Sequence, residues 1–139
     1  MEKEKRTLKF SEIFGFGAGG MFTYGFQLMI TGYYLLYYMT DIAGFSTVLA
    51  ASLYSTIQII KMVTMLFSGV IIDAINFRSG KYRTWVLVSG IGLGLFFPLS
   101  FFYYPLPQSV YVVVFMIIYT LQTLFYNVGW TAMRAVIGK

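Results

Sequence analysis

The chain has 139 residues, of which 58% are hydrophobic and 11% are charged, and its net charge is +5. A water-soluble domain of this size could not hide so much apolar surface, so lipid must be the solvent for most of the chain. The chain has no Cys and no His, and its five acidic residues flank the apolar runs, which excludes a thiol or imidazole site and a pair of catalytic carboxylates. We therefore predict no enzyme, no cofactor and no metal site. The basic residues lie at segment ends rather than on one face, which argues against a nucleic-acid partner.

The first apolar run covers residues 13–40 and follows a charged N-terminal segment, 1–12. A helix of this length measures about 42 Å, against roughly 30 Å for the hydrocarbon core, so the run predicts one uncleaved crossing. Turn-like residues at 43–46 end it, and a second apolar run covers 47–72.

The second half of the chain must fold back on itself. After a polar loop at 73–83, the run from Thr84 to Met133 contains no charge and would measure about 75 Å as one helix, too long for one crossing. Pro105 and Pro107 mark the reversal, because proline removes a backbone donor and disfavours helix before it. The sequence thus predicts an all-α membrane protein with four transmembrane helices, at about 13–40, 47–72, 84–104 and 110–133.

Nine of the ten basic residues lie before span one, between spans two and three, or after span four. By the positive-inside rule we predict a multi-pass protein of the cell membrane with both termini and the loop 73–83 in the cytoplasm. The tenth basic residue is Lys61, inside span two.

Lys61 is predicted to lie near the middle of the bilayer, because about 18 Å of helix separate it from Asp73, further than its side chain can extend. Burying an ammonium group there costs at least about 2.5 to 3.5 kcal/mol. Lys61 is therefore expected to face a water-filled cavity, to find an acid or to lose its proton, and no acid of this chain can reach it. The alternative is a structural lysine bonded to carbonyl groups of a neighbouring helix. Lys61 shares one helical face with Tyr54, Gln58, Met65 and Ser68.

Span four carries aromatic and amide side chains on one face, namely Tyr119, Gln122, Tyr126 and Trp130. Such a face suits a sugar, whose C–H surface stacks on rings and whose hydroxyls need hydrogen-bond partners. The same residue types also fill helix contacts and membrane interfaces. Taken alone, this pattern favours that structural interpretation over a sugar site. In span one, Gln27 is equally consistent with a cavity wall and with hydrogen bonds between helices.

Gly15, Gly17 and Gly20 match the spacing G-x-G-x-x-G, but no strand precedes them, so a dinucleotide site is rejected. These glycines, with Gly90 and Gly94 in span three, are expected instead to let helix backbones approach each other.

Two motifs point to a known family. Gly69 and Asp73 are followed by Arg78-Ser-Gly80-Lys81-Tyr82-Arg83-Thr-Trp85, and span one ends on Tyr34-Leu-Leu-Tyr-Tyr-Met-Thr40-Asp41 with Gly44 beyond it. They resemble motifs of the glycoside-pentoside-hexuronide:cation symporters, the melibiose permease-like family of the major facilitator superfamily. The resemblance covers the whole chain and implies the first four helices of a twelve-helix fold. The expected partners are the lipid bilayer, a small-molecule substrate and the remaining eight helices of the same transporter.

The resemblance also implies a gate. In such transporters two six-helix bundles rock about a midplane site, and charged residues of this loop latch the cytoplasmic side. The gate residues expected here are Asp73, Arg78, Lys81 and Arg83. The alternative is a plain topological signal of positive charge, and the motif spacing favours the gate.

Departures from the family pattern bear on ion coupling. An ungapped alignment on Gly69 places Gln58 where the family usually has a sugar-site arginine, and Lys61 and Met65 where it has two cation-binding aspartates. Trp130 stands where melibiose permease has a sugar-binding aspartate. The sequence therefore predicts transport of a sugar-like or other small polar solute without sodium coupling, with Lys61 and Gln58 in the coupling role and Gln27, Gln122, Tyr126 and Trp130 as substrate-binding residues.

Two alternatives remain open: a stand-alone four-helix protein that works as a dimeric small exporter, and a non-transporting scaffold or gene remnant. Such exporters depend on a membrane-buried glutamate in the first helix, and this chain has none there. A longer reading frame with eight further spans would favour the transporter.

Overall fold

The structure is a computed structural model that describes residues 10, 14, 17, 25–75 and 81–137. Every regular element in these ranges is helical. The chain divides into two compact units, Met1–Tyr37 and Tyr38–Lys139. Most of the expected N-terminal segment, 1–12, and most of the first span up to residue 24 lie outside the described residues.

Between Phe26 and Tyr37 the first unit has three consecutive helical segments, α2 (Phe26–Met29), η2 (Ile30–Tyr34) and α3 (Leu35–Tyr37). η2 is a π-helical turn, in which a backbone N–H bonds to the carbonyl group five residues before it. Such turns are uncommon and occur often at functional sites. Gln27, a predicted substrate residue, belongs to α2.

The second unit begins with another π-helical segment, η3 (Tyr38–Ile42), and a tight turn. Gly44 has a φ of 69°, a left-handed conformation that glycine adopts without strain. The N–H of Phe45 bonds to the carbonyl of Met39 at 2.9 Å, which satisfies one of the last helical acceptors. The side chain of Ser46 then caps the next helix by accepting a backbone hydrogen bond. The turn expected at 43–46 therefore both ends one helix and starts the next.

Three long helices form the rest of the second unit: α4 (Thr47–Ala74), α5 (Lys81–Ser100) and α6 (Gln108–Ile137). Each is long and apolar enough to cross a membrane. For this part of the chain the sequence predicts spans at 47–72, 84–104 and 110–133. The crossing expected at 13–40 lies partly outside the described residues and stays a prediction.

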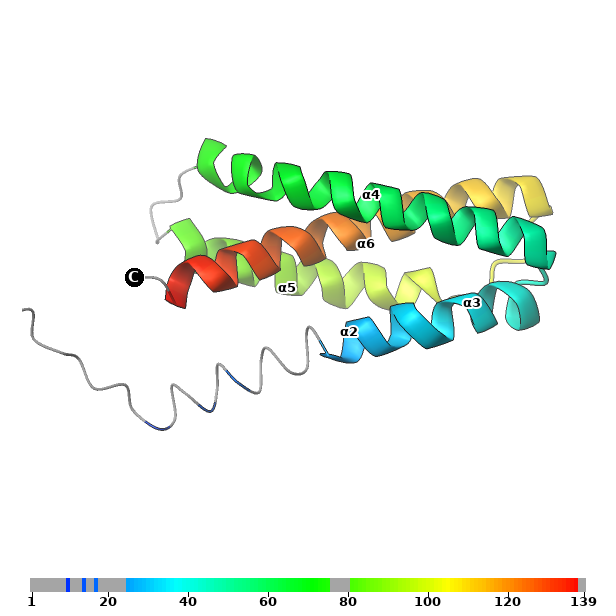
Figure 1. Cartoon of the computed structure of the whole chain (residues 1–139), viewed down its shortest axis with the longest axis horizontal. Helices are drawn as coiled ribbons and strands as arrows, with labels where there is room; N and C mark the ends of the chain where they lie inside the picture. Colours follow the sequence, from blue (N-terminus) through cyan, green and yellow to red (C-terminus); the bar gives the residue numbers. More distant parts are fainter. Residues whose placement is uncertain (1–9, 11–13, 15–16, 18–24, 76–80, 138–139) are drawn as a thin grey trace, which may run out of the picture. The chain divides into compact units, whose positions relative to one another are not determined.

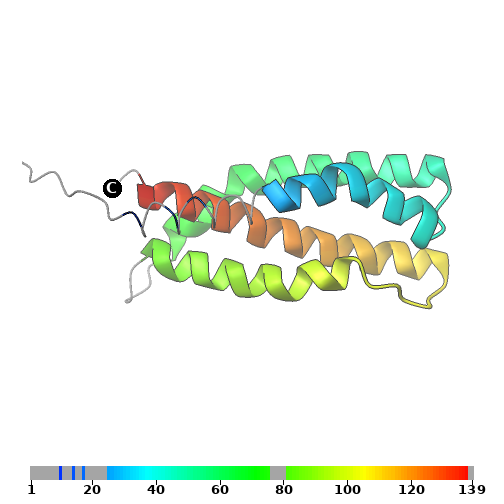
Figure 2. The same ribbon diagram turned by 90° about the horizontal axis from the view of Figure 1, so that it is seen from below.

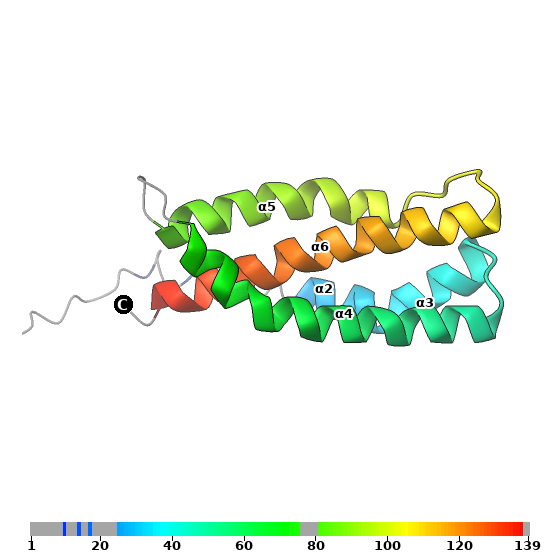
Figure 3. The ribbon, with the colours of Figure 1, turned by 90° about the horizontal axis from the view of Figure 1, so that it is seen from above.

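Helix α6 occupies the middle of the second unit. It packs against both α4 and α5, which scarcely touch each other. It lies between them over most of its length in Figures 2 and 3, and it crosses α5 in Figure 1. α4 and α6 run in the same direction and α5 runs in the opposite one (Figure 3). The chain path therefore brings the end of α4, the start of α5 and the end of α6 together. We call this the charged end, because Asp73, Arg83 and Arg134 belong to those helix termini.

Helix α5 ends at Ser100, earlier than the expected end at Tyr104. Pro98 lies inside its last turn and has no backbone N–H. The N–H groups of Phe101 and Phe102 bond to carbonyl groups three residues before them, at 3.1 and 3.3 Å. This tightened turn ends the helix, and the reversal that contains the two further prolines begins directly after it.

Aromatic side chains pack at the opposite end of the second unit. The hydroxyl oxygens of Tyr38 and Tyr111 lie 2.7 Å apart, and the Tyr38 hydroxyl donates to the carbonyl of Phe102 at 3.1 Å. The ring of Phe115 stacks on Tyr38. Toward the charged end, an apolar core consists of Ile72, Trp85, Val128 and Ala132.

Helices α5 and α6 approach closely at two glycines. A Cβ atom at Gly92 would collide with the ring of Phe125, and one at Gly129 would lie 2.7 Å from the Cβ of Ser89. Gly90 and Gly94, which the sequence suggests for this contact, have nothing within 4 Å of such a Cβ atom in the described structure. The expectation was wrong for this contact, because residues two apart on a helix point to nearly opposite sides.

Candidate functional site

Lys61 lies near the middle of the 28-residue helix α4 and is half-buried. Its Nζ atom lies 5.7 Å from the centre of the Tyr126 ring on α6. An aromatic face attracts a cation, and this attraction strengthens where water is scarce. The acidic residues among the described ones are Asp41 and Asp73, at the ends of η3 and α4, so neither supplies a counter-charge at the middle of the helix. The structure therefore joins one predicted coupling residue to one predicted substrate residue.

Asn127 ties the backbone of Lys61 to α6. Its Nδ2 group donates to the carbonyl oxygen of Lys61 at 3.0 Å and to the hydroxyl of Thr64 at 2.7 Å. One turn further along α4, the hydroxyl groups of Ser68 and Thr131 lie 2.8 Å apart. Polar contacts of this kind hold helices together in lipid, where apolar surfaces alone do not distinguish a helix from the solvent. We call this row of contacts the α4–α6 polar seam.

Replacing Asn127 with leucine is expected to weaken the α4–α6 contact by about 0.6 to 1.7 kcal/mol, the range of such hydrogen bonds in membrane proteins. The unfolding of the chain in detergent micelles, followed by circular dichroism during titration with a denaturing detergent, measures the change. Thr120→Val is the control, since within the described residues the Thr120 hydroxyl bonds to the carbonyl of Met116 on its own helix, at 2.7 Å, and to no other helix. Equal stability of the two variants would contradict a structural role for Asn127.

The other predicted substrate residues of α6 lie in different surroundings. Gln122 is fully buried, and its Oε1 atom accepts a hydrogen bond from the Ser100 hydroxyl at 2.7 Å, so it contacts α5. Trp130 lies nearer the charged end, where the guanidinium of Arg134 stacks over its ring at 4.6 Å. Gln58 is half-buried one turn before Lys61, and its side chain makes no hydrogen bond within the described residues. Gln27 belongs to the first unit.

The predicted gate residues are described only in part. Asp73 is exposed in the last turn of α4, and Arg83 is exposed in the first turn of α5. Arg78 lies outside the described residues, as does the side chain of Lys81.

Sequence reasoning missed the partners that join the helices. Thr64, Ser100 and Thr131 each bond a side chain of a neighbouring helix. The available signal was a hydroxyl side chain inside an apolar span, but most such hydroxyls bond to their own helix, as those of Ser55 and Thr56 do.

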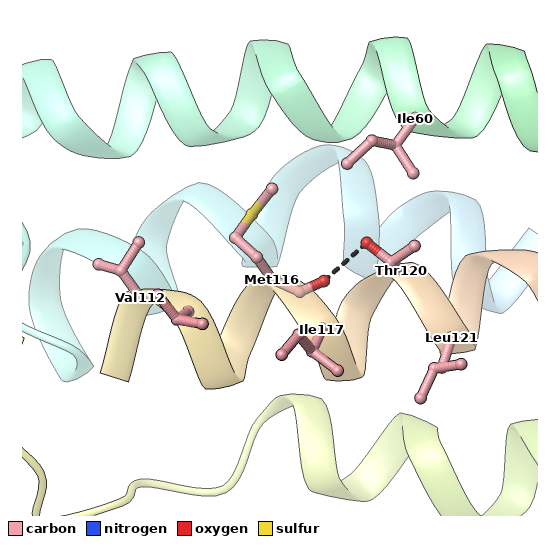
Figure 4. A pocket seen from close by; sticks show the side chains of 7 residues that line it. Ile60, Val112, Met116, Ile117, Thr120 and Leu121 are labelled. Atoms are coloured by element: carbon pink, nitrogen blue, oxygen red, sulfur yellow. Dashed lines mark hydrogen bonds between the residues drawn. The ribbon is translucent and has the colours of Figure 1, made fainter. Parts of the chain in front are cut away.

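A pocket of about 410 Å³ lies between α4 and α6 on the side of Lys61 away from the charged end (Figure 4). Its lining is almost entirely apolar and consists of Ile60, Val112, Val113, Met116, Ile117, Thr120 and Leu121. The one hydroxyl in it, from Thr120, turns back to the carbonyl of Met116. A sugar needs several hydrogen-bond partners, so this pocket is unsuited to one.

Comparison with known proteins identifies the chain. Residues 15–139 match the family model described as MFS/sugar transport protein. With three apolar helices long enough to span a bilayer, this makes the chain a multi-pass membrane protein. The chain belongs to the MFS/sugar transport protein family, within the major facilitator superfamily, as its two motifs predict.

Three curated relatives come from Escherichia coli (strain K12). The chain is 29% identical over 126 residues to the protein named "Putative glycoside/cation symporter YagG". This alignment covers 88% of this chain and 27% of the relative. It is 28% identical to a glucuronide carrier protein homolog, over 68% of this chain and 20% of the relative. It is 26% identical to the inner membrane symporter YicJ, over 75% of this chain and 23% of the relative. The chain thus spans about a quarter of the length of these relatives. No solved structure matches it.

Proposed function

We propose that this chain is the N-terminal part of a secondary transporter that moves a sugar-like or other small polar solute across the cell membrane without sodium coupling. The observation that carries the proposal is the ammonium group of Lys61 in the middle of α4, far from the carboxylates at the helix ends. Family membership supports the transport function, and the position and charge of Lys61 support the coupling mode.

A fixed ammonium group changes what the site can bind. A sodium ion needs oxygen ligands with negative charge nearby, and it would be repelled by a cation tethered to the same helix face. The ammonium can stabilise the polar site as a bound ion would, but it cannot be released to either side. Transport then proceeds as facilitated diffusion, or with protons if Lys61 itself exchanges one. In this proposal Gln58, one turn away, shares the coupling role.

The substrate site in this proposal centres on Lys61 and Tyr126. Trp130 and Gln122, on the same helix as Tyr126, and Gln27, in the first unit, are proposed as further substrate-binding residues. The ring of Tyr126 already lies against the ammonium group, and its face offers a stacking surface for a sugar. Because alternating access requires two halves, the remaining eight helices of a complete transporter would supply the opposite wall.

We also propose that the charged end faces the cytoplasm and that Asp73, Arg78, Lys81 and Arg83 form its gate. The exposed positions of Asp73 and Arg83 at adjacent helix termini support this assignment, because both side chains can reach a partner in another bundle. The excess of basic residues at this end supports the orientation.

The orientation predicts the side from which single cysteines react. The chain contains no cysteine, so Ser109→Cys, at the start of α6, and Arg83→Cys, at the charged end, each introduce one thiol. A membrane-impermeant maleimide is expected to label the Ser109→Cys thiol in intact cells and the Arg83→Cys thiol only after the membrane is opened. The reverse order would show that the topology is inverted.

The transport function itself is tested by uptake of radiolabelled glycosides into cells that express the full-length gene. We expect uptake of at least one member of a panel of glycosides, pentosides and hexuronides above that of cells with an empty vector. No uptake of any member, with the protein present in the membrane, would contradict the proposed function.

A further inference from the structure

Among the described residues, the positive charge of Lys61 has an aromatic neighbour and no carboxylate partner. The Tyr126 ring at 5.7 Å offers a cation a modest attraction, and the side chain of Asn127 bonds to the carbonyl oxygen of Lys61 rather than to its ammonium group. Both described acidic residues lie at helix ends. A cation held in the membrane interior normally pairs with an anion, because an unpaired charge is costly there. The chain therefore presents half of an ion pair.

A second cation, Arg134, lies on the face of α6 that carries Tyr126. Tyr126, Trp130 and Arg134 are spaced four residues apart, so they follow one another along one face at about 6 Å per step. The guanidinium of Arg134 covers the Trp130 ring at 4.6 Å, as the ammonium of Lys61 covers the Tyr126 ring. Arg134 is exposed at the charged end, where water and salt neutralise it, whereas Lys61 is half-buried inside the span. Of these two cations, Lys61 is therefore the one that requires an anionic partner.

We infer that the transported solute carries a carboxylate, as a sugar acid does, and that this carboxylate pairs with the ammonium of Lys61. The inference rests on the proposed transport function. A carboxylate would neutralise the ammonium and form a charge-assisted hydrogen bond with it. The C–H face of the same solute would lie against the ring of Tyr126. A neutral sugar would stack equally well but would leave the ammonium unpaired, so the site discriminates by charge rather than by shape.

The test compares two solutes that differ only at one carbon: methyl β-glucuronide, which carries a carboxylate, and methyl β-glucoside, which carries a hydroxymethyl group. The purified full-length protein is reconstituted in liposomes, and initial uptake of each labelled solute is measured. We expect the wild-type protein to prefer the glucuronide by on the order of tenfold to a hundredfold, the range that one hydrogen bond to a charged group provides.

Three variants locate the source of this preference. Lys61→Met keeps most of the length of the side chain but removes its charge, and it is expected to abolish the preference. Lys61→Arg keeps the charge and is expected to retain most of the preference. Arg134→Gln is the matched control, since it removes the other ring-stacked cation of α6 and is expected to leave the preference unchanged.

Equal uptake of both solutes by the wild-type protein would overturn the inference while leaving the transport function intact. A preference that survives Lys61→Met would also overturn it, because the charge would then be recognised elsewhere. Failure of the wild-type protein to transport either solute, or any other member of the panel, would instead count against the proposed function. If Lys61→Met does not fold, equal uptake of the two solutes by the wild-type protein still overturns the inference.

Discussion

Replacing Lys61 with alanine in the full-length protein is expected to lower uptake at least about tenfold, the effect of losing one charged hydrogen-bonding group from a binding site. Lys61→Asp is expected to do more than lower the rate. A carboxylate at this depth needs a cation from solution, so any uptake that remains should depend on added sodium or on protons. Initial uptake rates with and without sodium, corrected for the amount of protein in the membrane, measure both effects.

Met62→Ala is the matched control for these variants. Met62 is the next residue of α4, and its side chain is 65% exposed, on the outer surface of the second unit. Its replacement shortens a side chain in the same helical turn without touching the polar seam. Unchanged uptake and unchanged ion dependence in both Lys61 variants would rule out a role for this residue in transport.

Replacing Gly92 with leucine is expected to destabilise the second unit by about 1 to 3 kcal/mol, the usual effect of forcing extra atoms into a packed contact. The new side chain would need the space that the ring of Phe125 occupies, so α5 and α6 would have to move apart. Unfolding of the chain in micelles, followed by circular dichroism, measures the loss.

Gly90→Leu serves as the control for this prediction. It lies on the same helix, and nothing in the described structure lies within 4 Å of a Cβ atom there. Both variants replace glycine by a residue with higher helix propensity, which favours α5 by about 1 kcal/mol. Gly90→Leu is therefore expected to be neutral or stabilising. Equal stability of the two variants would show that the contact at Gly92 is not close.

The local features of the fold follow from recognisable chemistry. Gly44 and Ser46 end one helix and cap the next, as their residue types and positions suggest. Pro98 shows the limit of such rules, because one proline near the end of an apolar run does not reveal whether the helix continues past it. Pro105 and Pro107 mark the reversal, but α5 already ends at Ser100.

The contacts between helices are harder to predict than the helices themselves. In a water-soluble bundle, an apolar stripe shows which face of a helix is buried. In lipid the outer face is apolar too, so hydropathy does not reveal which way a helix is turned. The stripe predicted around Lys61 illustrates this limit. Ser68 contacts α6, as predicted for a member of the stripe. Met65 is exposed instead, and Thr64, which was not predicted, makes the contact with α6.

The candidate site depends in the same way on how each helix is rotated about its axis. Lys61 and Tyr126 were recognisable as unusual residues of two separate spans, but their contact requires α4 and α6 to run in parallel with one relative rotation, which no local pattern specifies. Gln122 belongs to the same predicted stripe as Tyr126, yet it bonds Ser100 on α5. The stripe of four side chains predicted on span four thus contacts two different helices, α4 and α5.

The proposed role of Lys61 is tested by the sodium dependence of uptake by the purified, reconstituted full-length protein. If the ammonium of Lys61 stands in for a bound cation, the initial rate will be the same in sodium and in choline buffers of equal ionic strength, and an imposed sodium gradient will drive no accumulation. A rate that rises tenfold with sodium, or accumulation driven by the sodium gradient, would show that Lys61 does not replace a bound cation.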